Sequence, residues 1–346
     1  MTKVLIDLLK LSNLNCGLGQ VAYNFAETLS QTDSEFEKHF LVPKKFKGKF
    51  GNDVIYHTKL GLKSYLRKNK FDLWHCIHQE PEVLPKDDTK ILMTIHDLNF
   101  LGEKSNEKAA KRLLKLQNIV DRTTQLAFIS EYSKSIALQH LKTSNKICSV
   151  IYNGVTCCKN GTKPKFFDGG NFFFTIGVLK PKKNFEVLIP IMKIFPDTLL
   201  IIAGKKKGSY YKHLKRIVEK ENLSNQIIFA GNISEEEKTW LYQNCKAFLF
   251  PSLYEGFGLP VIEAMLNGVP AIISNKTSLP EIGSDKAYYF DSFDSDAMAD
   301  VIQKSIQHFN SSTEISKKNR EYAEGFNWKE NVAGYSKLYL KIMQED

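Results

Sequence analysis

The feature that most constrains the fold is an alternation, along almost the whole chain, between short β-rich runs and segments of helical periodicity. This alternation is typical of parallel sheets covered by helices, because parallel neighbours need a crossover connection between them. We predict strands in the first half at residues 4–8, 39–42, 54–56, 73–76, 91–95, 126–129 and 149–152. In the second half we predict them at 172–176, 199–203, 227–230, 247–250, 271–274 and 287–290. The expected fold class is therefore α/β.

The length of 346 residues suits two domains of roughly 150 residues each. Residues 158–171, rich in Lys, Gly and Pro, interrupt the alternation and are the best candidate for a linker. We predict an N-terminal domain at 1–165, a C-terminal domain at 166–327 and a final helix at 328–346. The apolar face of this helical tail comprises Phe326, Trp328, Tyr335, Leu338, Tyr339 and Ile342.

Local patterns predict finer features. A helix is expected at 107–121. Its apolar face comprises Ala110, Leu113, Leu116 and Val120. Ser130 follows a predicted strand and precedes a helical segment, which predicts that its side chain caps that helix. Asn153 and Gly154 follow the strand at 149–152 and predict a tight turn.

The net charge of +10 is confined to one half of the chain. Residues 1–165 hold 26 Lys and Arg against 16 Asp and Glu, a difference of +10, whereas residues 166–346 hold 22 of each. A one-sided basic charge suggests an anionic partner, such as a membrane surface, a lipid phosphate or nucleic acid, or it serves only solubility.

The cysteines at 16, 76, 148, 157, 158 and 245 form no C-x-x-C pair, so we expect neither a disulfide framework nor a structural zinc site. No apolar run approaches the roughly 18 residues of a membrane span, and the N-terminus lacks the pattern of a signal peptide. The reducing cytoplasm is the expected location.

The sequence FPSLYEGFGLPVIE, residues 250–263, predicts an anion site. A buried strand ends at Pro251, a loop with Gly256 and Gly258 follows, and an apolar helical segment begins. Backbone N–H groups and the positive end of the helix dipole meet at such a loop and attract phosphate. The carboxylates of Glu255 and Glu263 cannot bind phosphate, so we expect them to hold hydroxyl groups. A sugar attached to a nucleotide satisfies both requirements.

Other candidates also follow predicted strands. GLGQVA at 17–22 matches G-x-G-x-x-A, but the chain after the next strand has four lysines and no acid to hold a nicotinamide dinucleotide. The glycines make either a tight turn or a ligand loop. His96 and Asp97 follow the strand at 91–95, where open sheets place their sites, so His96 either belongs to a site or is a structural histidine. GVLKPKKN at 177–184 carries three lysines, which either neutralise a diphosphate or form a solvated loop.

Together these residues resemble glycosyltransferase family 4 over nearly the whole chain. Glu255 and Glu263 match its E-x7-E signature, and the surrounding PSLYEGFGLPVIEAMLNGVPAIIS is close to the family pattern. The GLG loop, TIHDL, Ser130-Glu131, YNGV and GVLKPKKN fall in the family's order. The resemblance implies the GT-B fold: two Rossmann-like domains with parallel sheets facing a cleft, and a C-terminal helix that crosses back to the first domain.

The resemblance also implies roles for individual residues. Glu255 would contact the donor sugar, Glu263 the ribose and Lys183 the diphosphate. His96 would lie near the reaction centre and Gly19 over the phosphates. Backbone N–H groups would face the donor from Phe257, Gly258 and Leu259, the base would be lined by Gly231 and Ile233, and further sugar or acceptor contacts would come from Gly17, Asp97 and Asn153. Many family members carry Arg where this chain has Val178.

The resemblance implies transfer of a hexose or deoxyhexose from a nucleotide diphosphate sugar, with retention of anomeric configuration and without a metal or separate cofactor. GDP-mannose is the favoured donor, and the favoured acceptor is a glycan or lipid-linked oligosaccharide of cell-surface polysaccharide. The basic half would contact the inner face of an anionic membrane. Alternatives are a soluble disaccharide or polysaccharide synthase and an inactive sugar-binding relative. A nucleic-acid binder is disfavoured, since no RNA-reading motif or helix-turn-helix is present.

Overall fold

The computed structural model describes residues 1–344 except 15, 67, 68, 87, 144, 145, 157 and 159, and describes 63 and 64 by their backbone alone. The chain divides into two compact units. The N-terminal unit comprises Met1–Gly154 and Phe326–Asp346, and the C-terminal unit comprises Val155–Gly325.

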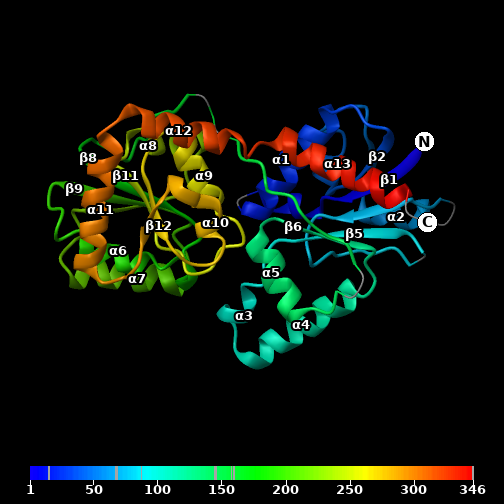
Figure 1. The fold of residues 1–346 in the computed structure, drawn as a ribbon, viewed down its shortest axis with the longest axis horizontal. Coiled ribbons are helices and arrows are strands. Elements are labelled where there is room, and N and C mark those ends of the chain that lie inside the picture. The colour runs from blue at the N-terminus through cyan, green and yellow to red at the C-terminus, as the bar shows by residue number, and fades with distance from the viewer. Residues whose placement is uncertain are drawn as a thin grey trace. The chain divides into compact units, whose positions relative to one another are not determined.

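The described part of the N-terminal unit contains a seven-stranded parallel sheet with the strand order β3-β2-β1-β4-β5-β6-β7 (Figure 1). Its strands are β1 (Thr2–Asp7), β2 (Phe36–Leu41), β3 (Ile55–His57), β4 (Leu73–Cys76), β5 (Lys90–Ile95), β6 (Gln125–Phe128) and β7 (Cys148–Val150). The order reverses between β1 and β4, where Val4 lies beside Leu73 and Asp7 beside Cys76. The central strands are buried, as their continuous apolar runs predict.

Helices cover both faces of this sheet. They are η1 (Leu9–Ser12), α1 (Gly17–Gln31), η2 (Lys44–Phe46), α2 (Lys59–Tyr65), α3 (Phe100–Glu103), α4 (Asn106–Val120), α5 (Glu131–His140) and α13 (Trp328–Gln344). One core contains Leu116 of α4 and Ala137 of α5. Helix α13, red in Figure 1, packs beside α1, with the Tyr335 ring edge-on to Phe25 and the Tyr339 ring edge-on to Phe36. Helix α13 therefore packs into the same core as α1 and β2.

The described part of the C-terminal unit contains a six-stranded parallel sheet with the order β10-β9-β8-β11-β12-β13. Its strands are β8 (Asn171–Ile176), β9 (Thr198–Ala203), β10 (Ile227–Gly231), β11 (Ala247–Phe250), β12 (Ala271–Ser274) and β13 (Tyr288–Phe290). The order reverses between β8 and β11, so this sheet repeats the pattern of the first one.

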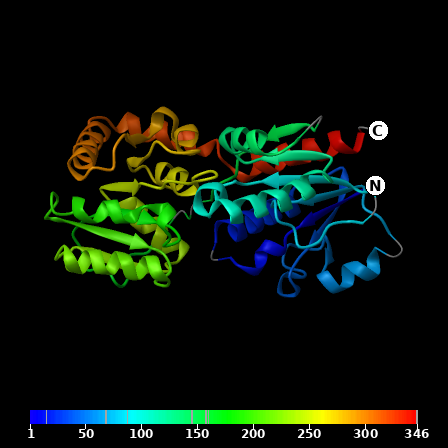
Figure 2. The same cartoon turned by 90° about the horizontal axis from the view of Figure 1, so that it is seen from below.

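Helices again flank the sheet (Figure 2). They are η3 (Pro181–Lys183), η4 (Phe185–Val187), α6 (Leu188–Ile191), α7 (Ser209–Lys220), α8 (Glu235–Asn244), α9 (Leu259–Leu266), α10 (Leu279–Gly283), η5 (Ser284–Lys286), α11 (Ser295–Asn310) and α12 (Thr313–Glu324). One core joins Phe173 of β8 with Leu214 of α7 and Ile302 of α11. On the opposite face, Tyr242 of α8 packs edge-on to Phe174 and Phe248.

The structure confirms every predicted strand to within a few residues, and it confirms the predicted helix as α4. The predicted face of α4 needs a correction, because Ala109 is buried and Ala110 is exposed. Ser130 caps α5 as expected, since its hydroxyl accepts the N–H of Ser133 at 3.0 Å. Among the described residues, no helix combines the length and the apolar composition needed to cross a membrane.

The predicted tight turn at Asn153 and Gly154 is wrong. The backbone forms no turn there, and the φ of Gly154 is not positive. Glycine serves a different purpose, because a Cβ on Gly154 would lie 2.5 Å from the backbone nitrogen of Trp328. Helix α13 comes close to the backbone at Gly154, although Trp328 lies far from Gly154 in sequence. This long-range contact, and not a local turn, explains why glycine occupies the position.

Candidate functional site

Two predicted site residues meet where the strand order of the C-terminal sheet reverses. Open α/β sheets bind ligands at the carboxyl ends of their strands, at such a reversal. Lys183 lies in η3, which follows β8, and Glu255 lies in the loop after β11. Because β8 and β11 are neighbours, their loops come together although the residues lie far apart in sequence.

Lys183 and Glu255 form a direct ion pair. Nζ of Lys183 lies 2.5 Å from Oε1 of Glu255 and 4.8 Å from the centre of the Phe250 ring. The two side chains are only 10% and 14% exposed, so water screens their charges weakly. The pair places a cation suited to phosphate beside a carboxylate suited to hydroxyl groups.

Backbone contacts hold the two loops together. The carbonyl oxygen of Lys182 accepts the Leu253 N–H at 2.8 Å and the Ser252 hydroxyl at 3.1 Å. Directly after β8, Gly177 leaves room for the stem of Lys183, since a Cβ there would lie 3.1 Å from its Cε atom. These contacts fix the position from which Lys183 reaches Glu255.

The loop after β12 fastens Glu255 from the other side. The Thr277 hydroxyl accepts the backbone N–H of Glu255 at 3.0 Å. The buried Ser278 hydroxyl lies 3.1 Å from the carbonyl oxygen of Glu255 and 2.9 Å from that of Phe257. The loop carrying Glu255 is therefore held by hydrogen bonds from two neighbouring loops.

Helix α9 begins directly after this loop. Gly258 has a φ of +112°, and a Cβ there would lie 2.8 Å from Cδ2 of Leu279, so the position requires glycine. Leu259 is the first residue of the helix. The partial positive charge of a helix N-terminus thus lies close in sequence to Glu255, as the anion-site prediction requires.

Glu263 lies further along α9 and is bonded through both oxygens. Its Oε1 atom lies 2.8 Å from Nζ of Lys238, and its Oε2 atom accepts the hydroxyl of Tyr242 at 2.9 Å. Sequence reasoning missed both partners, because they lie on α8 and carry no motif. Their ion pair and hydrogen bond appear only once α8 and α9 are packed together.

The predicted base-lining residues follow β10. Gly231 ends this strand with a φ of +83°, and its carbonyl oxygen accepts the N–H of Gly204 at 2.8 Å. Ile233 is half-buried and directly precedes Ser234, the cap of α8. Val178, at the position of the family's Arg, is 49% exposed.

In the N-terminal unit, the GLG loop forms the start of α1, as predicted. Gly17 is exposed, and a Cβ there would meet no atom within 4 Å. Gly19 is buried, and a Cβ there would lie 1.9 Å from the carbonyl oxygen of Asn13. The second glycine is therefore required by close packing of the chain against itself.

His96 follows β5 and is held by the segment that follows β4. Its Nε2 atom lies 2.7 Å from the carbonyl oxygen of Ile77, and its backbone N–H donates to Oε1 of Gln79 at 3.0 Å. The same Gln79 donates to the carbonyl oxygen of Asp97 at 2.8 Å. Burial lowers the pKa of His96, which is 5% exposed. A neutral ring whose Nε2–H donates to Ile77 follows from these contacts.

Asp97 and Asn153 have structural contacts of their own. Oδ1 of Asp97 accepts the N–H of Asn99 at 3.0 Å and so shapes the turn before α3. Asn153 is buried and, with His96 and Asn331, lines a small cavity beneath α13. Asp97 therefore lies next to His96 in the loop after β5, and Asn153 lines the same cavity as His96.

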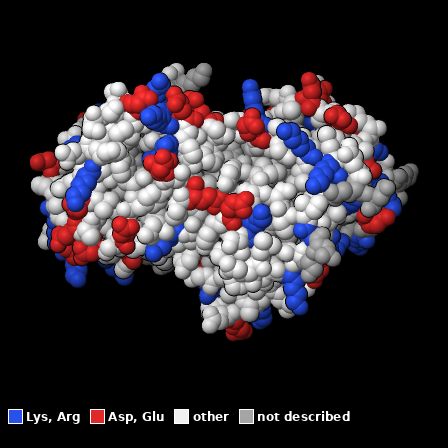
Figure 3. All heavy atoms as spheres, in the orientation of Figure 1, with Lys and Arg blue, Asp and Glu red and all other residues white. Residues whose placement is uncertain are grey.

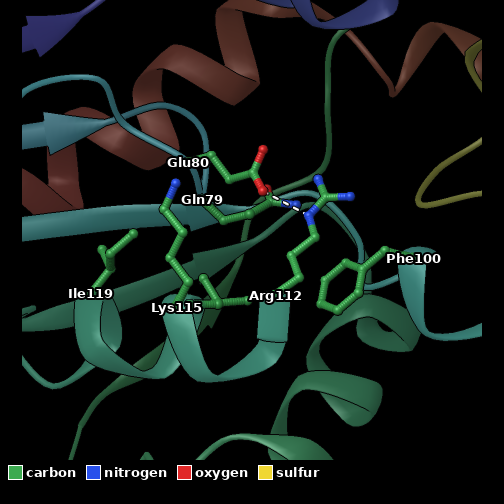
Figure 4. Close-up of a pocket in the computed structure, with 7 residues that line it drawn as sticks. Gln79, Glu80, Phe100, Arg112, Lys115 and Ile119 are labelled. Atoms are coloured by element: carbon green, nitrogen blue, oxygen red, sulfur yellow. Dashed lines mark hydrogen bonds and ion pairs between the residues drawn. The ribbon is translucent and has the colours of Figure 1, made fainter. Parts of the chain in front are cut away.

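A second small pocket lies beside Gln79 (Figure 4). Arg112 of α4 donates to Oε1 of Glu80 at 2.7 Å, and its guanidinium lies 4.7 Å from the centre of the Phe100 ring. Lys115, also from α4, lines the same pocket. The sequence predicted only the helix and its apolar face, and it did not predict this arrangement.

Asp7, at the carboxyl end of β1, was also missed. It is 6% exposed, and burial raises its pKa to about 6. Its Oδ1 atom accepts the N–H of Leu9 at 3.0 Å. A single acid at the end of an apolar strand carries no sequence signal that separates it from a solvated one.

Among the residues the structure describes, no cluster of three His, Cys, Asp or Glu side chains forms a potential metal site. The described cysteines, which are 16, 76, 148, 158 and 245, are free thiols, and Cys157 lies outside the described residues.

Residues 159–322, nearly the whole C-terminal unit, match the sequence model of a family described as "Glycosyl transferases group 1". Over 242 residues the chain is 29% identical to O-antigen chain mannosyltransferase B of Escherichia coli. This alignment covers 65% of this chain and 63% of that protein. Over 194 residues the chain is 29% identical to the serotype-specific mannosyltransferase WbdA of Escherichia coli. That alignment covers 53% of this chain and only 24% of WbdA.

Among solved structures, the sucrose-phosphate synthase of Thermosynechococcus elongatus aligns over 100% of both chains, with a TM-score of 0.80 and 18% identity. At this identity the similarity shows the fold alone. It confirms the predicted fold class, GT-B with two parallel sheets.

Proposed function

We propose that the protein transfers a hexose from a nucleotide diphosphate sugar to a hydroxyl group of an acceptor. The observation that carries this proposal is the Lys183–Glu255 pair at the reversal of the C-terminal sheet, beside the start of α9. A diphosphate needs the cation and the helix N-terminus, whereas a sugar needs the carboxylate. The match of residues 159–322 to the glycosyl transferase family supports the same conclusion.

The chemistry follows from where charge develops. When the bond from the sugar to the diphosphate breaks, negative charge grows on the leaving diphosphate. Lys183 and the N-terminus of α9 stabilise that charge, so the reaction proceeds without a metal ion. Glu255 binds hydroxyl groups of the sugar and orients it. We propose retention of anomeric configuration, which NMR of the product's anomeric proton tests directly, and activity in excess EDTA tests independence of metal.

GDP-mannose is the proposed donor, because the two relatives described above are named as mannosyltransferases. The experiment is a thermal-shift screen of GDP-, UDP- and dTDP-sugars, followed by a transfer assay with the radiolabelled sugar that stabilises the protein. A ligand at 100 times its Kd adds about 2.7 kcal/mol to the free energy of unfolding. Glu255→Ala and Lys183→Ala should each abolish transfer in folded protein. Ordinary activity in both variants would overturn the proposal.

The proposed acceptor is a growing glycan or lipid-linked oligosaccharide of a cell-surface polysaccharide. O-antigen chain mannosyltransferase B carries such a glycan in its name, which supports this choice. Lipid-linked and free oligosaccharides of the same sequence, compared as acceptors with one donor, test it. Equal use of both would show that the lipid is not recognised.

We also propose reversible contact between the N-terminal unit and an anionic membrane. On the face shown in Figure 3, acidic and basic side chains are interspersed. Helix α4 offers a more specific surface, because Leu114 is 65% exposed and Lys111 and Lys115 beside it are also exposed. Sedimentation with phosphatidylglycerol vesicles at low salt tests this contact, and binding should weaken as salt increases. A Lys111→Gln, Lys115→Gln variant should bind less.

His96 is proposed to contact the donor sugar or the reacting atoms. Its neutral ring and fixed backbone support a role as a hydrogen-bonding group rather than as a cation. His96→Asn should lower kcat in folded protein at pH 7.5, and it should also cost about 1–3 kcal/mol of the free energy of unfolding, because the Ile77 carbonyl oxygen loses its buried donor. An unchanged kcat would assign His96 to the core alone.

A further inference from the structure

Lys238 is a mostly buried cation in the first turns of α8. Its ammonium lies 2.8 Å from Oε1 of Glu263 and 2.8 Å from Oε2 of Glu235, and its side chain is 14% exposed. Burial alone would lower its pKa, but the two carboxylates raise the pKa above its ordinary value. Lys238 is therefore a cation at neutral pH.

The second carboxylate oxygen of Glu263, Oε2, is also hydrogen-bonded. It accepts the hydroxyl of Tyr242, whose ring is fully buried against Phe174 and Phe248. Lys238 and Tyr242 lie four residues apart on α8, so one face of this helix presents both donors to Glu263. A carboxylate has about four acceptor positions, and these two bonds leave the others for a ligand. Lys238 and Tyr242 together therefore set the direction of the remaining lone pairs of the Glu263 carboxylate.

The same helix begins at the segment proposed to line the base. Ser234 caps α8 reciprocally with Glu237; Ile233 directly precedes this cap, and Gly231 lies two residues before Ile233. Lys238 lies one turn after the cap and reaches across to α9. It therefore joins the helix that follows β10 to the carboxylate proposed to hold the ribose.

We propose that Lys238, with Tyr242, is a positioning residue for the nucleoside end of the donor: it fixes the carboxylate of Glu263 for the two ribose hydroxyls. This inference rests on the proposed function. It differs from the role of a simple stabilising ion pair, because a fixed carboxylate orientation changes discrimination between ligands and not only the free energy of unfolding.

The test compares GDP with 2′,3′-dideoxy-GDP, which lacks both ribose hydroxyls, by isothermal titration. The wild-type protein should prefer GDP, and Lys238→Met should reduce that preference about 10-fold. Inorganic diphosphate should bind both proteins equally, since its contacts do not involve Glu263. Lys238→Arg, which retains charge and donors, should recover most of the preference. The proposal would be overturned if Lys238→Met lowered the affinity for both nucleotides by the same factor, or if this variant retained the full preference for GDP.

Two further variants keep the result interpretable. Glu235→Gln alters the exposed partner of Lys238 and should leave the preference unchanged. If Lys238→Met does not fold, Tyr242→Phe supplies the same comparison, because it removes one donor to Glu263 and preserves the packed ring. An unchanged preference in Tyr242→Phe would then overturn the proposal. A wild-type protein that binds neither GDP nor the nucleoside diphosphate of any sugar in the thermal-shift screen would instead overturn the proposed function, and this inference with it.

Discussion

Nζ of Lys183 lies 2.5 Å from Oε1 of Glu255, so each side chain is the ionic partner of the other. Under the proposed function, a diphosphate that binds Lys183 competes with Glu255 for the ammonium group. In exchange, the carboxylate becomes available to hydroxyl groups of the sugar. With the proposed donor, binding would replace one internal ion pair by two protein–ligand interactions, and this exchange would couple the two ends of the donor.

The exchange predicts that Glu255→Gln separates binding from transfer. Transfer should fall at least about 100-fold, because an amide orients the sugar poorly and carries no charge. GDP alone should bind the variant as tightly as wild type or a few-fold more tightly, since Lys183 no longer has a competing carboxylate. Titration of GDP into both proteins measures this.

The matched control for that experiment is Lys183→Met, which should weaken the binding of GDP because the contact between the ammonium and the phosphate is lost. If Glu255→Gln weakened GDP as much as Lys183→Met does, the two residues would not compete for the cation. The free energy of unfolding should be measured for both variants, because a buried charge left without its partner costs about 3–5 kcal/mol.

The N-terminal unit should lose stability in mild acid. Burial lowers the pKa of His75 to about 3, that of His78 to about 2 and that of His57 to about 4. The unfolded chain takes up protons below about pH 6.5 while the folded histidines stay neutral, so the stability present above this pH is lost as pH falls. His75 and His78 together should cost about 2.7 kcal/mol for each pH unit well below 6.5.

Urea unfolding at pH 7.5, 6 and 5 checks this prediction. In a Trp240→Phe background the remaining tryptophans, Trp74 and Trp328, both lie in the N-terminal unit and report its unfolding alone. A free energy of unfolding that stays constant across this range would contradict the assignment of neutral, buried rings.

Asp7 should show the opposite dependence. Burial raises its pKa from 3.8 to about 6, so the folded state retains a proton that the unfolded state loses. Asp7 therefore destabilises the protein above about pH 6, by up to roughly 3 kcal/mol, and this cost disappears as pH falls toward 4. Asp7→Asn, which can still accept the Leu9 N–H, should stabilise the protein at pH 8 and have little effect at pH 4. Equal effects at the two pH values would show that the carboxyl group is ionised throughout.

The two glycines of the GLG loop should tolerate alanine very differently. Gly17→Ala places its Cβ in open space and should change the free energy of unfolding by less than about 0.5 kcal/mol. Gly19→Ala forces its Cβ against the carbonyl oxygen of Asn13, so a loss of at least about 2 kcal/mol is expected. Urea unfolding of both variants tests the difference. Similar losses would mean that Asn13 moves away at no cost.

The sequence predicted the architecture because its signals are local. An apolar run followed by a helical segment identifies a strand regardless of what lies elsewhere, and all the predicted strands are present. The motif around Glu255 is likewise local, since strand end, glycine loop and helix start are consecutive. Once the strand order is known, the neighbourhood of β8 and β11 brings Lys183 to this motif.

The rest depends on contacts between residues distant in sequence. Lys238 reads as one more lysine on an acidic helix, and only the packing of α8 against α9 gives it Glu263 as a partner. Gly154 reads as a turn residue, although the chain that demands it arrives 174 positions later, at Trp328. The buried side of α4 differs by one position from the predicted one, because Leu116 and Val120 fit a face that includes either Ala109 or Ala110.

The membership of α13 in the N-terminal unit has a consequence for the order of events on the ribosome. The C-terminal unit is one continuous segment, residues 155–325, and can fold as soon as it has emerged. The N-terminal unit must wait for Tyr335 and Tyr339 to cover Phe25 and Phe36. Although domains usually mature in the order of their synthesis, here the unit made first is completed only after residues 326–346 have been made, so the apolar surface that Tyr335 and Tyr339 cover stays exposed for longer during synthesis.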